Sequence, residues 1–250
     1  MTLEEYFLDH SEGALAFSGG VDSAYLLWAA VRYGRRVTAY YAQTPFQPRF
    51  EREDARRLAG DLGADLRVLS LDVLAEERIA ANPPDRCYHC KRAIFSAVAQ
   101  AAEADGFSLL WDGTNASDNQ DDRPGMRALR ELGVQSPLRL CGLDKAEIRR
   151  RSREAGLFTW DKPAYACLAT RIPAGEAVTL EKLQNTEAAE SFLFSLGLRD
   201  FRVRLDGGRA RIQARGDQFP LLLERRGEIL RELKGRYGGV LLDLEARDEQ

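Results

Sequence analysis

A short apolar segment that runs directly into a loop of small and polar residues constrains the fold of this chain most. Residues 14–17 are apolar, and residues 24–31 after the loop are again mostly apolar. This pattern predicts a buried strand, a tight loop and a helix. The loop between them consists of Ser18, Gly19, Gly20, Val21, Asp22 and Ser23.

The loop has the chemistry of a phosphate site. Gly19 and Gly20 let backbone N–H groups turn toward a ligand, and the unpaired N–H groups at a helix N-terminus favour an anion. Ser18 and Ser23 can donate to phosphate oxygens, and Asp22 can hold a cation that neutralises them. A serine- and glycine-rich turn with an aspartate cap would be the alternative without a ligand. Because these features occur together directly after a first strand, we favour nucleotide binding.

The loop resembles the SGGxDS pyrophosphate loop of ATP pyrophosphatases, which cleave ATP between its α- and β-phosphates. It matches neither the loop of γ-phosphate enzymes nor the dinucleotide G-x-G-x-x-G motif. The resemblance implies that ATP and Mg²⁺ are the ligands of this loop.

Strands and helices are predicted to alternate in the first part of the chain. A helix is predicted over residues 49–62, and strands are predicted over residues 36–42, 66–71 and 107–111. Such alternation indicates an α/β fold with a doubly wound parallel sheet, in which ligands bind outside the carboxyl ends of the strands.

A second polar loop follows the strand predicted over residues 107–111. It contains Gly113, Thr114 and Asn115, and it is expected at the same edge of the sheet as the first loop. In pyrophosphate-loop enzymes a Gly-Thr-Asn segment at this place commonly lines the nucleotide site. An ordinary Gly-Thr-Asn turn is the alternative.

The four cysteines suggest metal binding or catalysis in a reducing compartment. Cys87 and Cys90 open a helix predicted to reach about residue 104, so they face the same way, and the helix dipole and nearby basic residues favour their thiolates. Half-buried helical cysteines, a redox pair or half of a zinc site fit the same spacing. Cys167 is either a small buried hydrophobe or the third member of a thiolate cluster, whereas Cys141 is predicted to be structural. Arg171 follows Cys167 by four residues and can offer an anion-binding fork.

The alternation of strands and helices ends near residue 178, and a small α+β module follows. A helix is predicted over residues 179–196, a hairpin over residues 201–214, a helix over residues 219–233 and a strand over residues 240–244. The domains are therefore predicted as residues 1–172 and 173–250. Arg202 and Arg204 share one face of the first hairpin strand, where they could bind phosphate, form a subunit interface or simply be solvated.

Composition argues against two classes of partner. The formal net charge is −3, so no general basic field attracts nucleic acid. There is no run of 18 apolar residues and no signal-peptide pattern, so we expect no membrane partner and a cytoplasmic protein.

Within the pyrophosphate-loop group, the chain resembles the LarE family of ATP-dependent sacrificial sulfur transferases, which help make the nickel-pincer nucleotide cofactor of lactate racemase. The residues that carry the resemblance are the Ser18–Ser23 loop, residues 85–91 (DRCYHCK), residues 112–115 (DGTN), residues 122–125 (DRPG) including Arg123, residues 162–173 (KPAYACLATRIP) and residues 201–204 (FRVR).

The resemblance implies a specific activity. In one form of the family, a cysteine matching Cys167 gives up its own sulfur. In the other, three cysteines hold a 4Fe–4S cluster whose free iron can carry a sulfide. Cys87, Cys90 and Cys167 match the second form. The resemblance then implies a small-molecule nucleotide as substrate, a pyridinium biscarboxylate mononucleotide whose phosphate suits Arg171, Arg202 or Arg204. It also implies a homo-oligomer, by family likeness a hexamer.

Three other classes of protein remain open from the residues alone. A tRNA thiolase also pairs a pyrophosphate loop with cysteines or a cluster, although no added basic stretch for RNA is present. An amide-forming ligase could use the cysteines for a structural zinc. A nucleotide-sensing regulatory module would bind ATP without releasing pyrophosphate.

Overall fold

The computed structural model describes residues 1–118 and 124–247, so Asp122 and Arg123 lie outside the described residues. The chain divides into two compact units. The first contains Met1–Val73 and Asp85–Lys162, and the second contains Leu74–Pro84 and the chain from Pro163 onward. The segment that carries Cys167 therefore packs with the second unit, while the domain boundary at residue 172 stays a prediction.

The first unit is built on a parallel sheet, which confirms the predicted α/β class. The strands lie in the order β3-β2-β1-β4, and every pairing is parallel. Their bounds are β1 (Glu12–Ala16), β2 (Arg36–Gln43), β3 (Asp65–Ser70) and β4 (Leu110–Trp111).

The strand predicted over residues 107–111 is too long, because β4 pairs with β1 over two residues only. The Phe107 N–H still donates to Ala102 O at the end of the preceding helix, and the Asp112 N–H donates to Gln135 O. Only residues 110 and 111 of the predicted strand therefore form β4.

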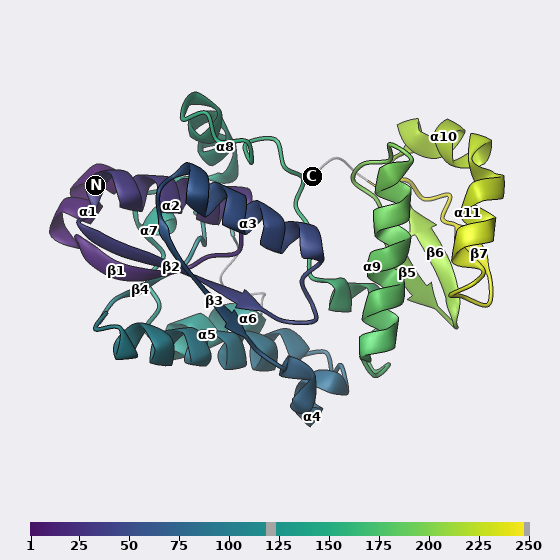
Figure 1. The fold of residues 1–250 in the computed structure, drawn as a ribbon, viewed down its shortest axis with the longest axis horizontal. Helices are drawn as coiled ribbons and strands as arrows, with labels where there is room; N and C mark the ends of the chain where they lie inside the picture. Colours follow the sequence, from purple (N-terminus) through teal and green to yellow (C-terminus); the bar gives the residue numbers. More distant parts are fainter. Residues whose placement is uncertain (119–123, 248–250) are drawn as a thin grey trace. The chain divides into compact units, whose positions relative to one another are not determined.

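Helices cover both faces of this sheet (Figure 1). Leu15 and Tyr41 pack in a core with α1, α2 and α3, whereas their neighbours Ala14 and Tyr40 pack with α5 on the opposite face. This alternation follows from the two-residue period of a strand. The helices of the unit are α1 (Leu3–Asp9), α2 (Val21–Tyr33), α3 (Arg49–Asp61), α5 (Arg86–Ala104), α6 (Pro124–Glu131), α7 (Pro137–Leu140) and α8 (Lys145–Glu154).

The second unit has a sheet in the order β5-β6-β7 and its own apolar core. The predicted hairpin is present: β5 and β6 are antiparallel, and Gly207 and Gly208 turn the chain with φ angles of 54° and 77°. Both angles lie in the left-handed region, where glycine has no steric cost. The elements are α4 (Glu77–Ala80), α9 (Leu180–Ser195), β5 (Arg202–Asp206), β6 (Arg209–Gln213), α10 (Phe219–Glu224), α11 (Arg226–Leu233) and β7 (Val240–Leu242), with short 3-10 turns at Leu168–Arg171 and Gly216–Gln218. Another short 3-10 turn, Val73–Ala75, spans the passage from the first unit to the second.

The single helix predicted over residues 219–233 is wrong. Arg225 has φ −85° and ψ 8° and separates α10 from α11. Leu222 of α10 and Ile229 of α11 both lie in the core of the second unit. None of the helices in the described part of the chain combines the length and the apolar character that a membrane crossing requires.

Candidate nucleotide site

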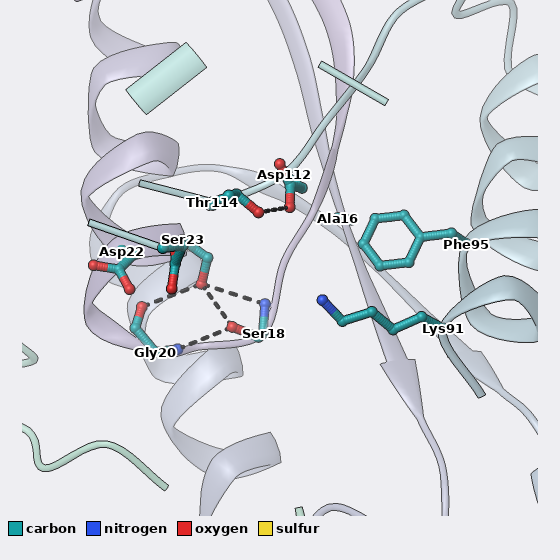
Figure 2. A pocket seen from close by; sticks show the side chains of 11 residues that line it. Ala16, Ser18, Gly20, Asp22, Ser23, Lys91, Phe95, Asp112 and Thr114 are labelled. Atoms are coloured by element: carbon teal, nitrogen blue, oxygen red, sulfur yellow. Dashed lines mark hydrogen bonds between the residues drawn. The ribbon is translucent and has the colours of Figure 1, made fainter. Parts of the chain in front are cut away.

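The loop of residues 18–23 lies at the carboxyl end of β1, and the loop after β4 lies beside it at the same edge of the sheet. Because β1 stands between β2 and β4, the connections from the sheet diverge there, which is where open α/β sheets bind ligands. A pocket opens between the two loops (Figure 2). It is lined by Ala16, Ser18, Gly20, Asp22, Ser23, Lys91, Phe95, Asp112, Gly113, Thr114 and Asp118.

The N-terminus of α2 faces this pocket without a side-chain cap. Gly20 occupies the N-cap position and has no side chain that could accept the first N–H groups of the helix. Gly19 has a φ of 75°, so the chain bends sharply just before the helix. An anion at this end would receive N–H groups and the favourable end of the helix dipole.

The two serines of the loop are held together. Ser18 Oγ and Ser23 Oγ lie 3.0 Å apart, and Ser23 Oγ donates to Gly20 O at 3.1 Å (Figure 2). Both serines line the pocket, and their role as phosphate donors stays a prediction.

Gly113 touches the start of α2 so closely that a side chain does not fit. A Cβ at this position would lie 2.9 Å from Ser23 N and 3.0 Å from Ser23 Cα, both backbone atoms. This glycine thus joins the two predicted loops. Thr114 also lines the pocket and donates to Asp112, while the buried Asn115 accepts the Ser117 N–H at 2.8 Å and shapes the loop.

Asp22 has a partner that sequence reasoning missed. Lys145 Nζ, from the first residue of α8, lies 2.6 Å from Asp22 Oδ2. Asp22 Oδ1 is buried and has no hydrogen-bond partner among the residues that the structure describes. The sequence signal was weak, because an aspartate followed by a lysine at the start of a helix is also typical of an ordinary helix cap. An Mg²⁺ ion prefers such a carboxylate oxygen, so Asp22 fits the predicted cation.

Lys162 is a second missed residue beside the loop. Its Nζ lies 2.7 Å from Asp54 Oδ2 on α3 and 3.4 Å from the backbone oxygen of Gly19. The Lys162 backbone oxygen in turn accepts from Arg149 of α8 at 2.9 Å. The loop is therefore held from α3 and α8, in addition to its own hydrogen bonds.

The cysteine pair has the predicted placement on one helix. Cys87 is exposed and Cys90 half-buried in the first turns of α5, and neither forms a disulfide. Cys167 precedes the 3-10 turn Leu168–Arg171 in the second unit. In residues 1–118 and 124–247 no group of three or more His, Cys, Asp or Glu side chains is arranged to hold a metal ion. Two ligands of the proposed cluster thus share one turn of helix, and the three-cysteine site stays a prediction.

Cys141 differs from these three. It packs against the core of the first unit, and burial raises the pKa of its thiol. A thiol that keeps its proton is a poor nucleophile and a poor metal ligand.

The predicted arginines gather within the second unit around the segment that carries Cys167. Arg202 donates to Ala164 O, and Arg204 donates to Thr170 O at 2.7 Å. Burial, together with the charges of Arg171 and neighbouring arginines, lowers the pKa of the Arg202 guanidinium to about 10. Arg202 Nη1 also lies 3.6 Å from Asp200 Oδ1, so part of this positive charge is matched within the unit.

Arg171 already has an anionic partner. Its side chain is 1% exposed, and Nε donates to Glu190 Oε1 at 2.9 Å. The same guanidinium donates to Ala166 O at 2.9 Å. Roles for Arg171, Arg202 and Arg204 in substrate phosphate binding stay predictions.

Comparison with known proteins adds full-length relatives. No family model matches the chain. It is 36% identical over 249 residues to an uncharacterized protein of Synechocystis sp., covering 97% of this chain and 92% of that protein. It is 35% identical over 248 residues to the pyridinium-3,5-bisthiocarboxylic acid mononucleotide synthase of Lactiplantibacillus plantarum, covering 97% and 89%. A match to the tRNA-specific 2-thiouridylase MnmA of Frankia alni is 30% identical but covers 59% of this chain and 52% of that enzyme.

Proposed function

This chain belongs to the LarE family, that of the pyridinium-3,5-bisthiocarboxylic acid mononucleotide synthase, and we propose that it uses ATP to convert a carboxylate of a pyridinium mononucleotide into a thiocarboxylate. The observation that carries the proposal is the pocket at the uncapped N-terminus of α2. There the backbone of Gly113, in the second loop, packs closely against Ser23 of the first. Together with the full-length similarity, this pocket supports an enzyme that binds the leaving pyrophosphate of ATP.

The reaction is proposed to proceed in two steps. A carboxylate is a poor electrophile because its negative charge repels nucleophiles. Its oxygen first attacks the α-phosphorus, the bond to the β-phosphate oxygen breaks, and pyrophosphate leaves. Backbone N–H groups at α2, with Ser18 and Ser23, would stabilise the charge on that leaving group. A hydrosulfide nucleophile then attacks the acyl carbon, AMP leaves with the electron pair of the C–O bond, and one proton is released.

The sulfur is proposed to come from a cluster held by cysteines. Cys87 and Cys90 fit two positions of such a site, since they lie one turn apart on α5 and form no disulfide, and Cys167 would supply the third. When bound, a 4Fe–4S cluster with three thiolate ligands leaves one iron free to carry the transferred sulfide. Cys167 giving up its own sulfur is the alternative within the same family.

Product formation tests the proposed reaction. Anaerobic protein is incubated with Mg²⁺, ATP, sulfide, ammonium and pyridinium-3,5-biscarboxylic acid mononucleotide, so that sulfur and nitrogen nucleophiles compete, and the products are separated by mass. We expect AMP, pyrophosphate and a product in which sulfur replaces oxygen. ATP hydrolysis to ADP, or a product with nitrogen in place of oxygen, would contradict the proposal, and the second outcome would indicate an amide-forming ligase.

Iron and acid-labile sulfide analysis tests the sulfur source. Cys87→Ala, Cys90→Ala and Cys167→Ala should each lose iron, whereas Cys141→Ala is the matched control and should keep it. Colourless anaerobic protein with stoichiometric zinc would contradict the cluster. If Cys167 instead gives up its sulfur, the protein mass should fall after one turnover by the mass of hydrogen sulfide.

A tRNA thiolase is the less well supported of the two candidate functions. The match to MnmA covers about half of each protein, whereas the match to the pyridinium mononucleotide enzyme covers nearly all of this chain. Filter binding to bulk tRNA at two salt concentrations separates them. Tight binding that falls steeply with salt would favour the thiolase.

A further inference from the structure

Asp22 and Lys145 form an ion pair beside the nucleotide pocket. Lys145 Nζ lies 2.6 Å from Asp22 Oδ2, and the side chains of Lys145 and Asp22 are 36% and 21% exposed. The other carboxylate oxygen, Oδ1, is buried without a hydrogen-bond donor in the part of the chain that the structure describes. Leaving such an oxygen unmatched costs free energy, so a cation that contacts Oδ1 would match a group that the ammonium at Oδ2 leaves unmatched.

The backbone of Lys145 is fixed although its side chain is long. Its N–H donates to Ser117 Oγ at 3.1 Å, in the loop after β4, and it is the first residue of α8 after the cap Asp144. The ammonium is therefore carried on a flexible stem rooted next to the second loop of the pocket. A lysine of this kind acts as a point charge that can change partner.

We propose that Lys145 changes partner when ATP binds. In the nucleotide-free protein its ammonium neutralises Asp22, and when Mg²⁺ arrives with ATP the metal takes Asp22 and the ammonium moves to the phosphates. This inference rests on the proposed ATP-dependent function. Its physical basis is charge: a divalent cation and an ammonium on one carboxylate repel each other, while the phosphates bring new negative charge into the same pocket.

Two affinities test the exchange, and neither depends on turnover. The first is binding of Mn²⁺, as a spectroscopic probe for Mg²⁺, to nucleotide-free protein by electron paramagnetic resonance. The second is binding of the non-cleavable α,β-methylene analogue of ATP at saturating Mg²⁺ by calorimetry. For Lys145→Met we expect Mn²⁺ to bind about tenfold tighter, because a competing positive charge is gone, and the analogue to bind about tenfold weaker.

Matched variants keep the result interpretable. Lys145→Gln keeps an N–H donor without the charge and should give the same two opposite shifts. Lys145→Arg keeps the charge and should move each affinity by less than about threefold. Lys182→Met removes a lysine of the second unit that pairs with Glu176 at 2.8 Å, and it should change neither affinity.

The opposite signs separate partner exchange from simple anchoring. If Lys145 only fastened the two loops together, both ligands would bind more weakly, and the exchange would be overturned. It would equally be overturned if neither affinity changed, or if the wild-type protein bound neither ligand. The wild type could bind both ligands, and the Lys145 variants could show the opposite shifts, while the wild type makes no thiocarboxylate. In that case the proposed function fails and the exchange stands.

Discussion

Replacing Glu190 with glutamine is predicted to destabilise the second unit strongly. Glu190 Oε1 accepts the Arg171 Nε–H at 2.9 Å and the Val203 N–H at 2.8 Å, and Oε2 accepts the Tyr165 hydroxyl. The side chains of Arg171 and Glu190 are 1% and 2% exposed, so water cannot replace what is lost.

The magnitude follows from the charge that would remain. Glutamine can keep one oxygen near Arg171 Nε and the Val203 N–H, but its amide N–H₂ would then face the donor Arg171 Nη2, which now lies 3.3 Å from Oε2. The guanidinium would stay buried without a countercharge. Breaking a buried pair in this way costs about 3–5 kcal/mol, a large share of the roughly 5–15 kcal/mol that stabilises a typical domain.

Hydrogen exchange is the suitable assay. All three tryptophans of the chain lie within residues 1–162, so tryptophan emission does not report on the second unit. The Val203 amide lies in the second unit and reports on its stability. In Glu190→Gln its hydrogen exchange should be at least about a hundredfold faster than in the wild type. Glu181→Gln, in the first turn of the same helix, is exposed and should leave the exchange unchanged.

A loss of protection below about fivefold, equivalent to less than about 1 kcal/mol, would refute this reasoning. It would mean that Glu190 does not hold Arg171, and the guanidinium would be free to bind an anion as the sequence suggested. The double change Arg171→Met with Glu190→Gln supplies the complementary check, because removing both charges should restore much of the lost stability.

Two further predictions concern the first unit. Gly113→Ala should weaken ATP binding and lower the free energy of unfolding by about 1–3 kcal/mol, because its Cβ would lie 2.9 Å from the backbone nitrogen of Ser23. Gly60→Ala is the control, because Gly60 lies in a helix and a new Cβ there would have nothing within 4 Å. It should leave the free energy of unfolding unchanged or raise it by up to about 1 kcal/mol. Equal urea midpoints for the two variants would contradict the close contact at Gly113. In metal-free protein, a thiol reagent at neutral pH should modify the exposed Cys87 well before Cys141, because burial raises the pKa of the Cys141 thiol. Labelling rates measured by mass spectrometry test this order, and faster labelling of Cys141 would contradict it.

Much of the first unit could be predicted from the sequence because its signals are local. The apolar run before Ser18, the glycines of the loop and the helical period after Ser23 lie within one short stretch, and β1 and α2 form there. The pair Cys87 and Cys90 begins α5 as expected, and the hairpin at Gly207 and Gly208 has the turn that its glycines favour. The family resemblance rested on such motifs, and the full-length similarity confirms it.

What the sequence could not determine are the contacts between residues far apart in the chain. Nothing near Asp22 in the sequence points to Lys145, and nothing near Arg171 points to Glu190, yet these ion pairs decide which charges at each site are already matched. The break at Arg225 was not predicted either, because the apolar residues on both sides of it, Leu222, Ile229 and Leu233, have the spacing of one continuous helix face. The sequence by itself determined the loop and its chemistry, because hydrogen-bonding groups and backbone freedom are local properties. Only the tertiary structure decided how its charges are paired, because an ion pair depends on distance in space.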